Sequence, residues 1–279
     1  MIDYKFNEKE LCEQLLEYIN KTYDGHYSKN KFQSTEFIVD CGHGEGFCIG
    51  IMNISDETLD VLKNFASINP NIVINPGQNI KTISEAKNIM ASAEIVEDFP
   101  QEFGVYDLNE FLSVLSLVQP AELSFDDKFV TISSTGDNRS KIKYFFSEPE
   151  ILTTPQKDIN MPECEFGISI TESVLDQIRK AAAVLGHTEL VLTGDNGVVT
   201  ATVLDDRDST ANTFSMELDG DNECKNEFKF VINIANLKLL PGDYYVSISS
   251  KLISNWTNVS RAAPVNYFIA LEKTSEFHV

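Results

Sequence analysis

Short amphipathic segments recur along the chain, each opened by a residue that caps helices. Four residues hold the N-cap positions: Ser55, Asp107, Thr171 and Asn233. A side-chain oxygen there accepts a hydrogen bond from a free backbone N–H of the first turn. Apolar residues then return every three or four positions, which predicts helices with one buried face. Each pattern ends at turn residues: Asn69-Pro70, Pro120, Gly186 and Pro241-Gly242. We therefore predict four short helices.

Between these helices the apolar residues alternate with polar ones, and β-branched and aromatic residues are frequent. Alternation with a period of two is typical of strands that have one buried face. The clearest runs are 128–132, 141–146, 189–192, 198–204, 244–249 and 266–271. Turn residues separate neighbouring runs at Pro76-Gly77, Asp126-Asp127 and Asn196-Gly197, as tight hairpins require. The pattern predicts a small antiparallel meander after each helix.

The helix and its meander repeat at intervals of roughly 60 residues, which indicates an internally repeated architecture. We predict an α+β fold of two similar domains, each made of two β-α-β-β-β units with the helices on one face of antiparallel sheets. The stretch 147–163 holds three of the nine prolines and lacks periodicity, which is typical of a linker. The predicted parts are an N-terminal appendage (1–51), flexible or partly helical, domain 1 (52–150), a connector (151–162) and domain 2 (163–279).

Composition narrows the class of protein without naming a function. Of 279 residues, 42% are hydrophobic and five are cysteines in no framework-like spacing. With no spanning apolar run and no signal region, the chain is expected in a reducing cytoplasm, away from membranes. The formal charge of −21 comes from 22 basic and 43 acidic side chains. Such a charge opposes an open groove that grips phosphates, although acidity most often reflects solubility alone.

The glycine-rich stretch "CGHGEGFCIG" at 41–50 raises the question of a nucleotide or metal site. Its glycines match neither the phosphate-loop nor the dinucleotide spacing, and it contains no lysine. Cys41, His43 and Cys48 do not have a familiar zinc spacing, and no fourth ligand is evident. Ordinary reduced thiols are the favoured interpretation. We predict no metal, no cofactor and no catalytic residue, so the protein is not expected to be an enzyme.

Four longer stretches carry a specific resemblance: "LKNFASIN" (62–69), "VYDLNEFLSVLSLV" (105–118), "FKFVINIANLKLLPGDYYV" (228–246) and "VNYFIALE" (265–272). In this order they resemble the DNA polymerase sliding clamps of T-even-type myoviruses, and the likeness covers residues 52–279. "MNISDETLDVLKNFASI" resembles the beginning of such a clamp. The resemblance implies three two-domain subunits joined head to tail in a closed ring, with helices lining the hole and sheets outside.

The same resemblance implies a function and a set of partners. A sliding clamp encircles duplex DNA and tethers the phage replicative polymerase for processive synthesis, after an ATP-dependent clamp loader has placed it there. The family also serves late transcription, with late-transcription factors and host RNA polymerase as partners, in the host cytoplasm. A closed ring holds DNA by topology and needs only a weakly basic lining. The resemblance thereby removes the objection raised by the acidic charge.

Candidate site residues follow from the helix faces and from the connector. Lys63, Arg179, Lys180 and Lys238 lie off the apolar stripes, so we expect them to face the hole and contact phosphate; ordinary solvated charges remain the alternative. Ile151 and Leu152 are apolar connector residues that could bind a partner peptide, with packing against the adjacent sheet as the favoured alternative. Ring closure should use edge strands. Arg139, Lys141 and Lys143 form a basic cluster without an assigned role.

Residues 1–51 have a different character. They resemble the truncated start of a small phage nucleotide-kinase-like family, in which the glycine segment leads into a helix that is absent here. We therefore expect a junction without activity, and expect the domain cores to be complete from Met52 onward. Two alternatives of other classes remain: a nucleotide-metabolism enzyme built on this segment, and a β-rich virion structural protein. A solution mass would separate a trimer from both.

Overall fold

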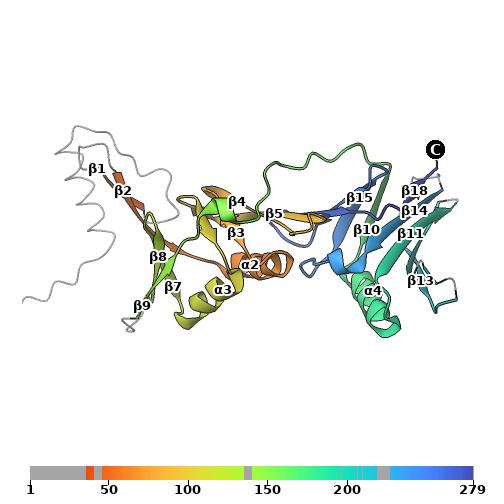
Figure 1. Cartoon of the computed structure of the whole chain (residues 1–279), viewed down its shortest axis with the longest axis horizontal. Helices are drawn as coiled ribbons and strands as arrows, with labels where there is room; N and C mark the ends of the chain where they lie inside the picture. Colours follow the sequence, from red (N-terminus) through yellow and green to blue (C-terminus); the bar gives the residue numbers. More distant parts are fainter. Residues whose placement is uncertain are drawn as a thin grey trace, which may run out of the picture. The chain divides into compact units, whose positions relative to one another are not determined.

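The structure is a computed structural model of the chain (Figure 1). It describes residues 36–40, 46–134, 140–195, 197–205, 207–208, 210–218 and 227–278, with side chains from Met52 onward. The chain divides into two compact units, Met1–Ile51 and Met52–Val279. Near the end of the first, β1 (Glu36–Asp40) pairs antiparallel with β2 (Gly46–Asn53). Residues 1–35 of the predicted appendage, the residues Cys41 and His43, and the side chain of Cys48 lie outside the described residues.

The unit Met52–Val279 contains three α-helices among its described residues: α2 (Asp56–Ile68), α3 (Leu108–Leu117) and α4 (Glu172–Leu185). Their predicted N-caps are confirmed, because the side chains of Ser55, Asp107 and Thr171 each accept a hydrogen bond from the backbone of the first turn. Gly186 ends α4 in the left-handed conformation, with φ of 74°, which glycine adopts without steric cost.

The prediction of a fourth α-helix is wrong. Asn233 does cap a first turn, but only the short 3₁₀ helix η2 (Ile234–Asn236) forms. Leu237, Leu239 and Leu240 are all buried. Burial at positions two apart does not fit one face of an α-helix, so the chain leaves helical geometry to place these leucines in the core.

The strands complete the repeated pattern that the sequence predicts. Their bounds are β3 (Ile72–Ile74), β4 (Gly77–Ile83), β5 (Ile89–Phe99), β6 (Phe103–Val105), β7 (Ala121–Phe125), β8 (Phe129–Ser134), β9 (Lys141–Phe145), β10 (Phe166–Ile170), β11 (Glu189–Asp195), β12 (Val198–Leu204), β13 (Phe214–Leu218), β14 (Phe228–Asn233), β15 (Tyr244–Ser249), β16 (Ile253–Asn258), β17 (Val265–Ala270) and β18 (Glu276–Phe277). Each helix, with η2 as the fourth, precedes three strands, so the α+β architecture is confirmed. The elements from α2 to β9 are called the first half below, and those from β10 to β18 the second half.

Strands are exchanged between successive repeats. β10, which precedes α4, pairs with β15 of the following repeat. β14, which precedes η2, pairs with β11 of the preceding repeat, and β6 likewise pairs with β3. The second half therefore holds the sheet β13-β12-β11-β14-β18, while β7, β8 and β9 follow one another in the first half. A repeat completes its sheet only with a strand from its neighbour.

One six-stranded sheet, in the order β10-β15-β16-β17-β5-β4, joins the two halves. The pairing of β17 with β5 runs from Val265 opposite Ala93 to Ile269 opposite Ile89. These backbone hydrogen bonds satisfy groups that would otherwise form two exposed sheet edges. The two halves are thus continuous at the level of the backbone.

Each half has its own aromatic cluster inside a common hydrophobic core. In the first half the rings of Phe99, Phe103, Phe125 and Phe146 contact one another. In the second half the cluster consists of Phe166, Phe228, Phe230 and Phe277. Contacts between rings add to the burial of large apolar surfaces. The repeat is therefore visible in the packing as well as in the order of elements.

The helices lie together on one side of the sheets. Figure 1 shows α2, α3 and α4 along the lower side of the strands in that view, whereas the chain that follows the 3₁₀ helix η1 (Pro149–Ile151) runs along the other side. Each helix buries one apolar face against the strands. Their polar faces consequently form one common surface.

Candidate nucleic-acid interface

Two of the predicted basic residues are exposed on the helix surface. Lys63 lies on α2 with its ammonium group 3.2 Å from the Asp60 carboxylate, one turn earlier, and both side chains are exposed. Lys180 is an exposed residue of α4. An exposed pair such as Lys63–Asp60 contributes little to stability. Both amines can therefore reach toward a phosphate at small cost.

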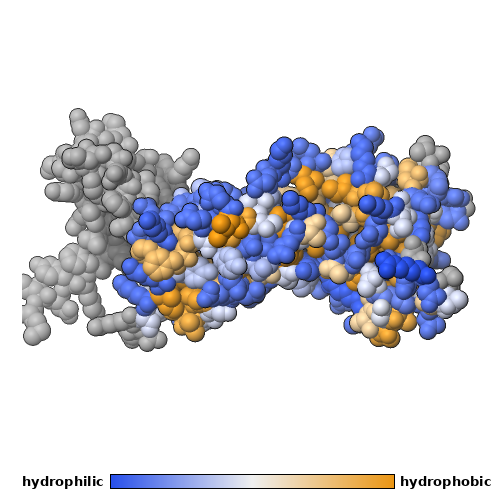
Figure 2. Space-filling view, in the orientation of Figure 1, coloured by the Kyte–Doolittle hydropathy of each residue, from blue (hydrophilic) through white to orange (hydrophobic). Residues whose placement is uncertain are grey.

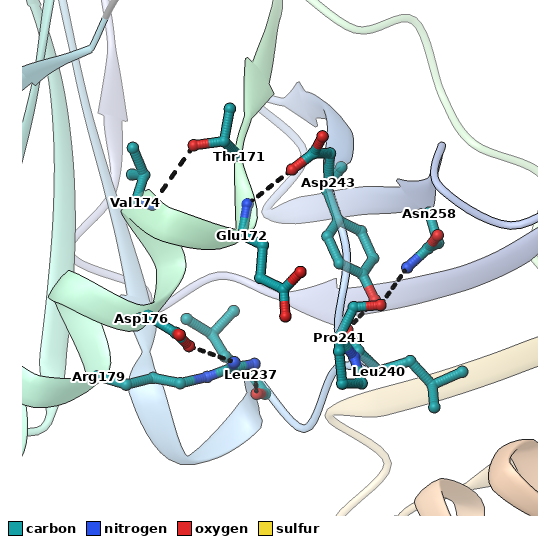
Figure 3. Close-up of polar contacts among 11 residues, drawn as sticks. Thr171, Glu172, Val174, Asp176, Arg179, Leu237, Leu240, Pro241, Asp243 and Asn258 are labelled. Atoms are coloured by element: carbon teal, nitrogen blue, oxygen red, sulfur yellow. Dashed lines mark hydrogen bonds and ion pairs between the residues drawn. The ribbon is translucent and has the colours of Figure 1, made fainter.

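Arg179, by contrast, is held by neighbouring groups (Figure 3). Its Nη2 donates to the carbonyl of Leu237 at 3.2 Å, and its Nη1 lies 3.7 Å from the Asp176 carboxylate on the same helix. The guanidinium group thereby ties α4 to the segment that follows η2. A phosphate contact by Arg179 would use the donors that remain free.

Lys238 is also engaged within the subunit. Its ammonium group donates to the carbonyl of Ser67, in the last turn of α2, and its own carbonyl accepts from Asn64 Nδ2 at 3.0 Å. The C-terminal end of a helix carries unsatisfied carbonyls and a partial negative charge, which a lysine stabilises. The structure thus gives Lys238 a structural role that the sequence did not reveal.

The surface of α3 differs from those of α2 and α4 because it has no basic residue. Its serine hydroxyls bond to carbonyls of their own helix, Ser113 to Asn109 at 2.7 Å and Ser116 to Ser113 at 2.6 Å. Hydrophobic side chains gather near the ends of α3 and α4 (Figure 2), where Leu117 is 76% exposed and Val184 is 84% exposed. The helix surface is therefore unevenly charged.

The N-terminus of α4 is capped from two directions, as Figure 3 shows. Thr171 accepts from the Val174 N–H at 3.4 Å, and Asp243 accepts from the Glu172 N–H at 2.8 Å. An acidic side chain at this position stabilises the positive end of the helix dipole. The sequence indicates a turn at Pro241-Gly242, next to Asp243, but it does not indicate which helix the carboxylate caps.

The two apolar connector residues have different environments. Ile151 is 68% exposed, whereas Leu152 is only 7% exposed. A Cβ atom at Gly104 would lie 2.8 Å from Leu152 Cδ1, so the leucine packs closely against that backbone. Leu152 is therefore part of the core, in agreement with the alternative of packing that the sequence favoured, and only Ile151 offers an exposed apolar side chain. The basic strand residues Lys141 and Lys143 are exposed on β9, and Arg139 lies outside the described residues.

Comparison with known proteins identifies the family to which this chain belongs. Residues 55–149 match the family model of DNA polymerase processivity factors, and residues 168–273 match that of the gp45 sliding clamp, C terminal. The chain is 35% identical over 226 residues to the sliding clamp of Vibrio phage KVP40, covering 79% of this chain and 99% of that protein. The chain belongs to the phage sliding-clamp family. The clamp of Enterobacteria phage T4 is 30% identical over 238 residues, with 80% and 98% of the two chains covered.

Solved structures of low sequence identity share the fold of this sliding clamp. The PCNA2–PCNA3 complex from Sulfolobus tokodaii matches with a TM-score of 0.59 at 15% identity, covering 80% of this chain and 98% of that one. A. fulgidus PCNA bound to the C-terminal region of FEN-1 also gives a TM-score of 0.59 at 15% identity, with 81% and 98% covered. The clamp resemblance of residues 52–279 and the α+β fold class predicted from the sequence are thus confirmed.

The family establishes that the protein is a sliding clamp and DNA polymerase processivity factor of phage replication. It does not support the nucleotide-metabolism or virion alternatives. Among the residues whose side chains are described, no group of three or more His, Cys, Asp or Glu side chains is placed to bind a metal. In the same part of the clamp, no helix is both long and apolar enough to cross a bilayer.

The different burial of the connector residues predicts different effects on stability. Leu152→Ser should lower the free energy of unfolding by about 3 kcal/mol, because it leaves a cavity and buries a hydroxyl. Ile151→Ser should change it by no more than about 0.5 kcal/mol, since the side chain is already exposed. Urea denaturation followed by circular dichroism measures both. Equal decreases in the two variants would contradict this placement of Leu152.

Proposed function

We propose that the clamp acts as a homotrimeric ring around duplex DNA and tethers the phage polymerase, without catalytic activity of its own. An ATP-driven clamp loader places it on DNA in the host cytoplasm, and late-transcription factors with host RNA polymerase use the same ring. The observation that carries the proposal is the common surface formed by α2, α3 and α4 on one side of sheets from both halves (Figure 1). Such a surface suits the inner wall of a ring.

The two-domain division with a connector at 151–162 belongs to the same proposal. Two separate family matches, one on each side of the connector, support it.

Ring closure is assigned to the edge strands β9 and β13. Each of them pairs with one neighbouring strand in the described sheets, β9 with β8 and β13 with β12. An edge with free backbone donors and acceptors can add a strand from another subunit. β9 belongs to the first half and β13 to the second. A head-to-tail contact between them would therefore repeat around a closed ring.

The side chains of the two edges are complementary in one antiparallel register. Placing Lys143 opposite Glu217, both of them exposed, forms an ion pair on the solvent face. The same register sets Tyr144 opposite Met216, and both of these side chains are half-buried. Opposite residues of an antiparallel pair lie on the same face, so charged and apolar positions both match. Lys143 is already ordered by the Phe129 ring, with its Nζ 4.2 Å from the ring centroid.

Charge reversal tests this interface. Lys143→Glu or Glu217→Lys alone should shift trimer dissociation about tenfold or more toward monomer, since like charges meet at each interface. The combined exchange should restore the wild-type midpoint. Sedimentation equilibrium measures the change, with Lys251→Glu in the exposed β15–β16 turn as the matched control. The register is rejected if the double variant is no better than the single ones.

Phosphate contacts in the hole are assigned to Lys63, Arg179, Lys180 and Lys238. Lys63 and Lys180 are exposed, whereas Arg179 and Lys238 also hold parts of the subunit together. A ring confines DNA by topology, so a few weak contacts are sufficient. The formal charge of −21 is then compatible with DNA binding. The sharpest test uses the two lysines that have no such additional role.

Replacing Lys63 and Lys180 together with alanine should leave the trimer intact and reduce polymerase processivity several-fold. The dependence of DNA binding on salt should weaken by about one unit of logarithmic slope for each lysine–phosphate interaction that the substitutions remove. Primer extension against a trapped template measures processivity, and salt titration measures the slope. The matched control is Lys251→Ala with Lys273→Ala, outside the helix surface. Unchanged processivity would remove the two lysines from the lining.

The partner surface is assigned to the connector around Ile151 and Leu152. Ile151 offers the accessible apolar side chain, and Leu152 anchors the backbone beside it. An exposed apolar residue of this kind suits the hydrophobic and aromatic side chains of a peptide. Titration of a polymerase C-terminal peptide should give roughly tenfold weaker binding to Ile151→Ser than to wild type. Exposed Val259→Ser is the control, and equal affinity for all three proteins would exclude Ile151.

A further inference from the structure

The segment Leu237–Asp243, between η2 and β15, contacts two helices from different halves. On the side of α4, the Leu237 carbonyl accepts from Arg179, and Asp243 caps the first turn (Figure 3). On the side of α2, the Lys238 carbonyl accepts from Asn64. These contacts are independent of the backbone pairing between β17 and β5. They form a second line of attachment between the halves, on the helix side of the sheets.

Asn64 connects this segment to the sheet as well. Its Oδ1 accepts from the Tyr267 hydroxyl at 2.8 Å, while its Nδ2 donates to Lys238. The Tyr267 oxygen in turn accepts from the Leu240 N–H at 3.2 Å. Burial raises the pKa of Tyr267 well above its ordinary value, so the hydroxyl keeps the proton that it donates to Asn64. The amide of Asn64 is thereby fixed in one orientation.

Two further contacts strengthen the attachment across the halves. The Lys238 ammonium group donates to the carbonyl of Ser67 at the end of α2. In the turn between β4 and β5, Asn88 Nδ2 donates to Asn236 Oδ1 of η2 at 2.9 Å. Each contact joins an element of the first half to an element of the second. Their donors and acceptors come from short, well-anchored side chains or from the backbone, except for the lysine.

We propose that Asn64 and Lys238 are positioning residues that fix the angle between the two halves of the clamp subunit, and through that angle the closure of the ring. Hydrogen bonds between β17 and β5 lie along a single line, about which a sheet can twist. Contacts on the helix side oppose that rotation. The proposal rests on the ring proposed above, because β9 and β13 lie in different halves and their relative orientation decides whether a third subunit can close the circle.

The angle can be measured within a single subunit. Spin labels at Asp60 on α2 and Gln177 on α4, in a protein whose native cysteines have been replaced, report the distance between the halves by electron–electron resonance. Asn64→Ala should broaden or shift this distance distribution, since it removes both hydrogen bonds of the amide and leaves the net charge unchanged. Ser67→Ala on the same helix is the matched control, because its carbonyl remains available to Lys238. An unchanged distribution in Asn64→Ala overturns the proposal.

Ring closure is the second measurement. Subunits that carry Asn64→Ala or Lys238→Met should dissociate from the trimer about tenfold faster than wild-type subunits. Subunit exchange between differently labelled rings measures this rate. Lys63→Met removes a charge from the same surface but none of the contacts between the halves. Subunits with this substitution should exchange at the wild-type rate. Equal acceleration in Lys63→Met and Lys238→Met would show a charge effect and overturn the positioning role. If no trimer exists, the ring proposal fails. The distance measurement still decides whether the contacts of Asn64 and Lys238 fix the angle between the halves.

Discussion

The pairing of β17 with β5 is the constraint on which the rest of the subunit depends. It merges strands from the beginning and the end of the unit into one sheet, and it leaves no free edge where the halves meet. Free edges remain at β9 and β13, each at the outer margin of its own sheet. The helices of both halves can then share one side of the subunit, because this pairing joins the two halves. In the proposed ring, contacts within the subunit and contacts between subunits would thus use the same backbone hydrogen bonding at different places.

The distribution of charge follows a similar division. Some of the candidate cations serve the protein itself, as the contacts of Arg179 on α4 and of Lys238 after η2 with backbone carbonyls show. Others, such as Lys180, remain available to a ligand. A repressor with so little uncommitted positive charge would hold DNA weakly. A closed ring holds the duplex by enclosing it, so weak contacts are sufficient. Strong phosphate binding would hinder the sliding that such a ring requires.

Local signals in the sequence predicted the local structure. The caps at Ser55, Asp107 and Thr171 were predictable, because an N-cap depends on atoms within three residues. The segment after Asn233 was misjudged, since three leucines that look helical are required by the core in another geometry. The exchange of strands between repeats was not predicted. Neither alternation nor turn chemistry states which strand lies beside which.

Of the candidate site, the sequence predicted only which residues lie on the exposed faces of helices. Placing Lys63 and Lys180 on exposed faces needed the helical period alone.

The roles of Asn64 and Asp243 depend on partners far away in sequence, the Lys238 carbonyl and the first turn of α4. No periodicity records such contacts. Leu152 illustrates the same point, because an apolar residue in a connector can be buried or exposed, and the close approach of Gly104 decides it.

Strand exchange between repeats has a consequence for the order in which the chain can fold during synthesis. A helix and its meander cannot close their own sheet, because a strand of each sheet is borrowed from the adjoining repeat. The pairing of β5 with β17 further joins residues that are 172 (265 − 93) to 180 (269 − 89) positions apart, and such distant pairings form late. While the ribosome is still translating the second half, β5 has no partner on one side. Just beyond the stretch that pairs with β17, β5 carries the exposed carboxylates of Glu94 and Asp98, and charged side chains on a strand discourage premature pairing with another nascent chain.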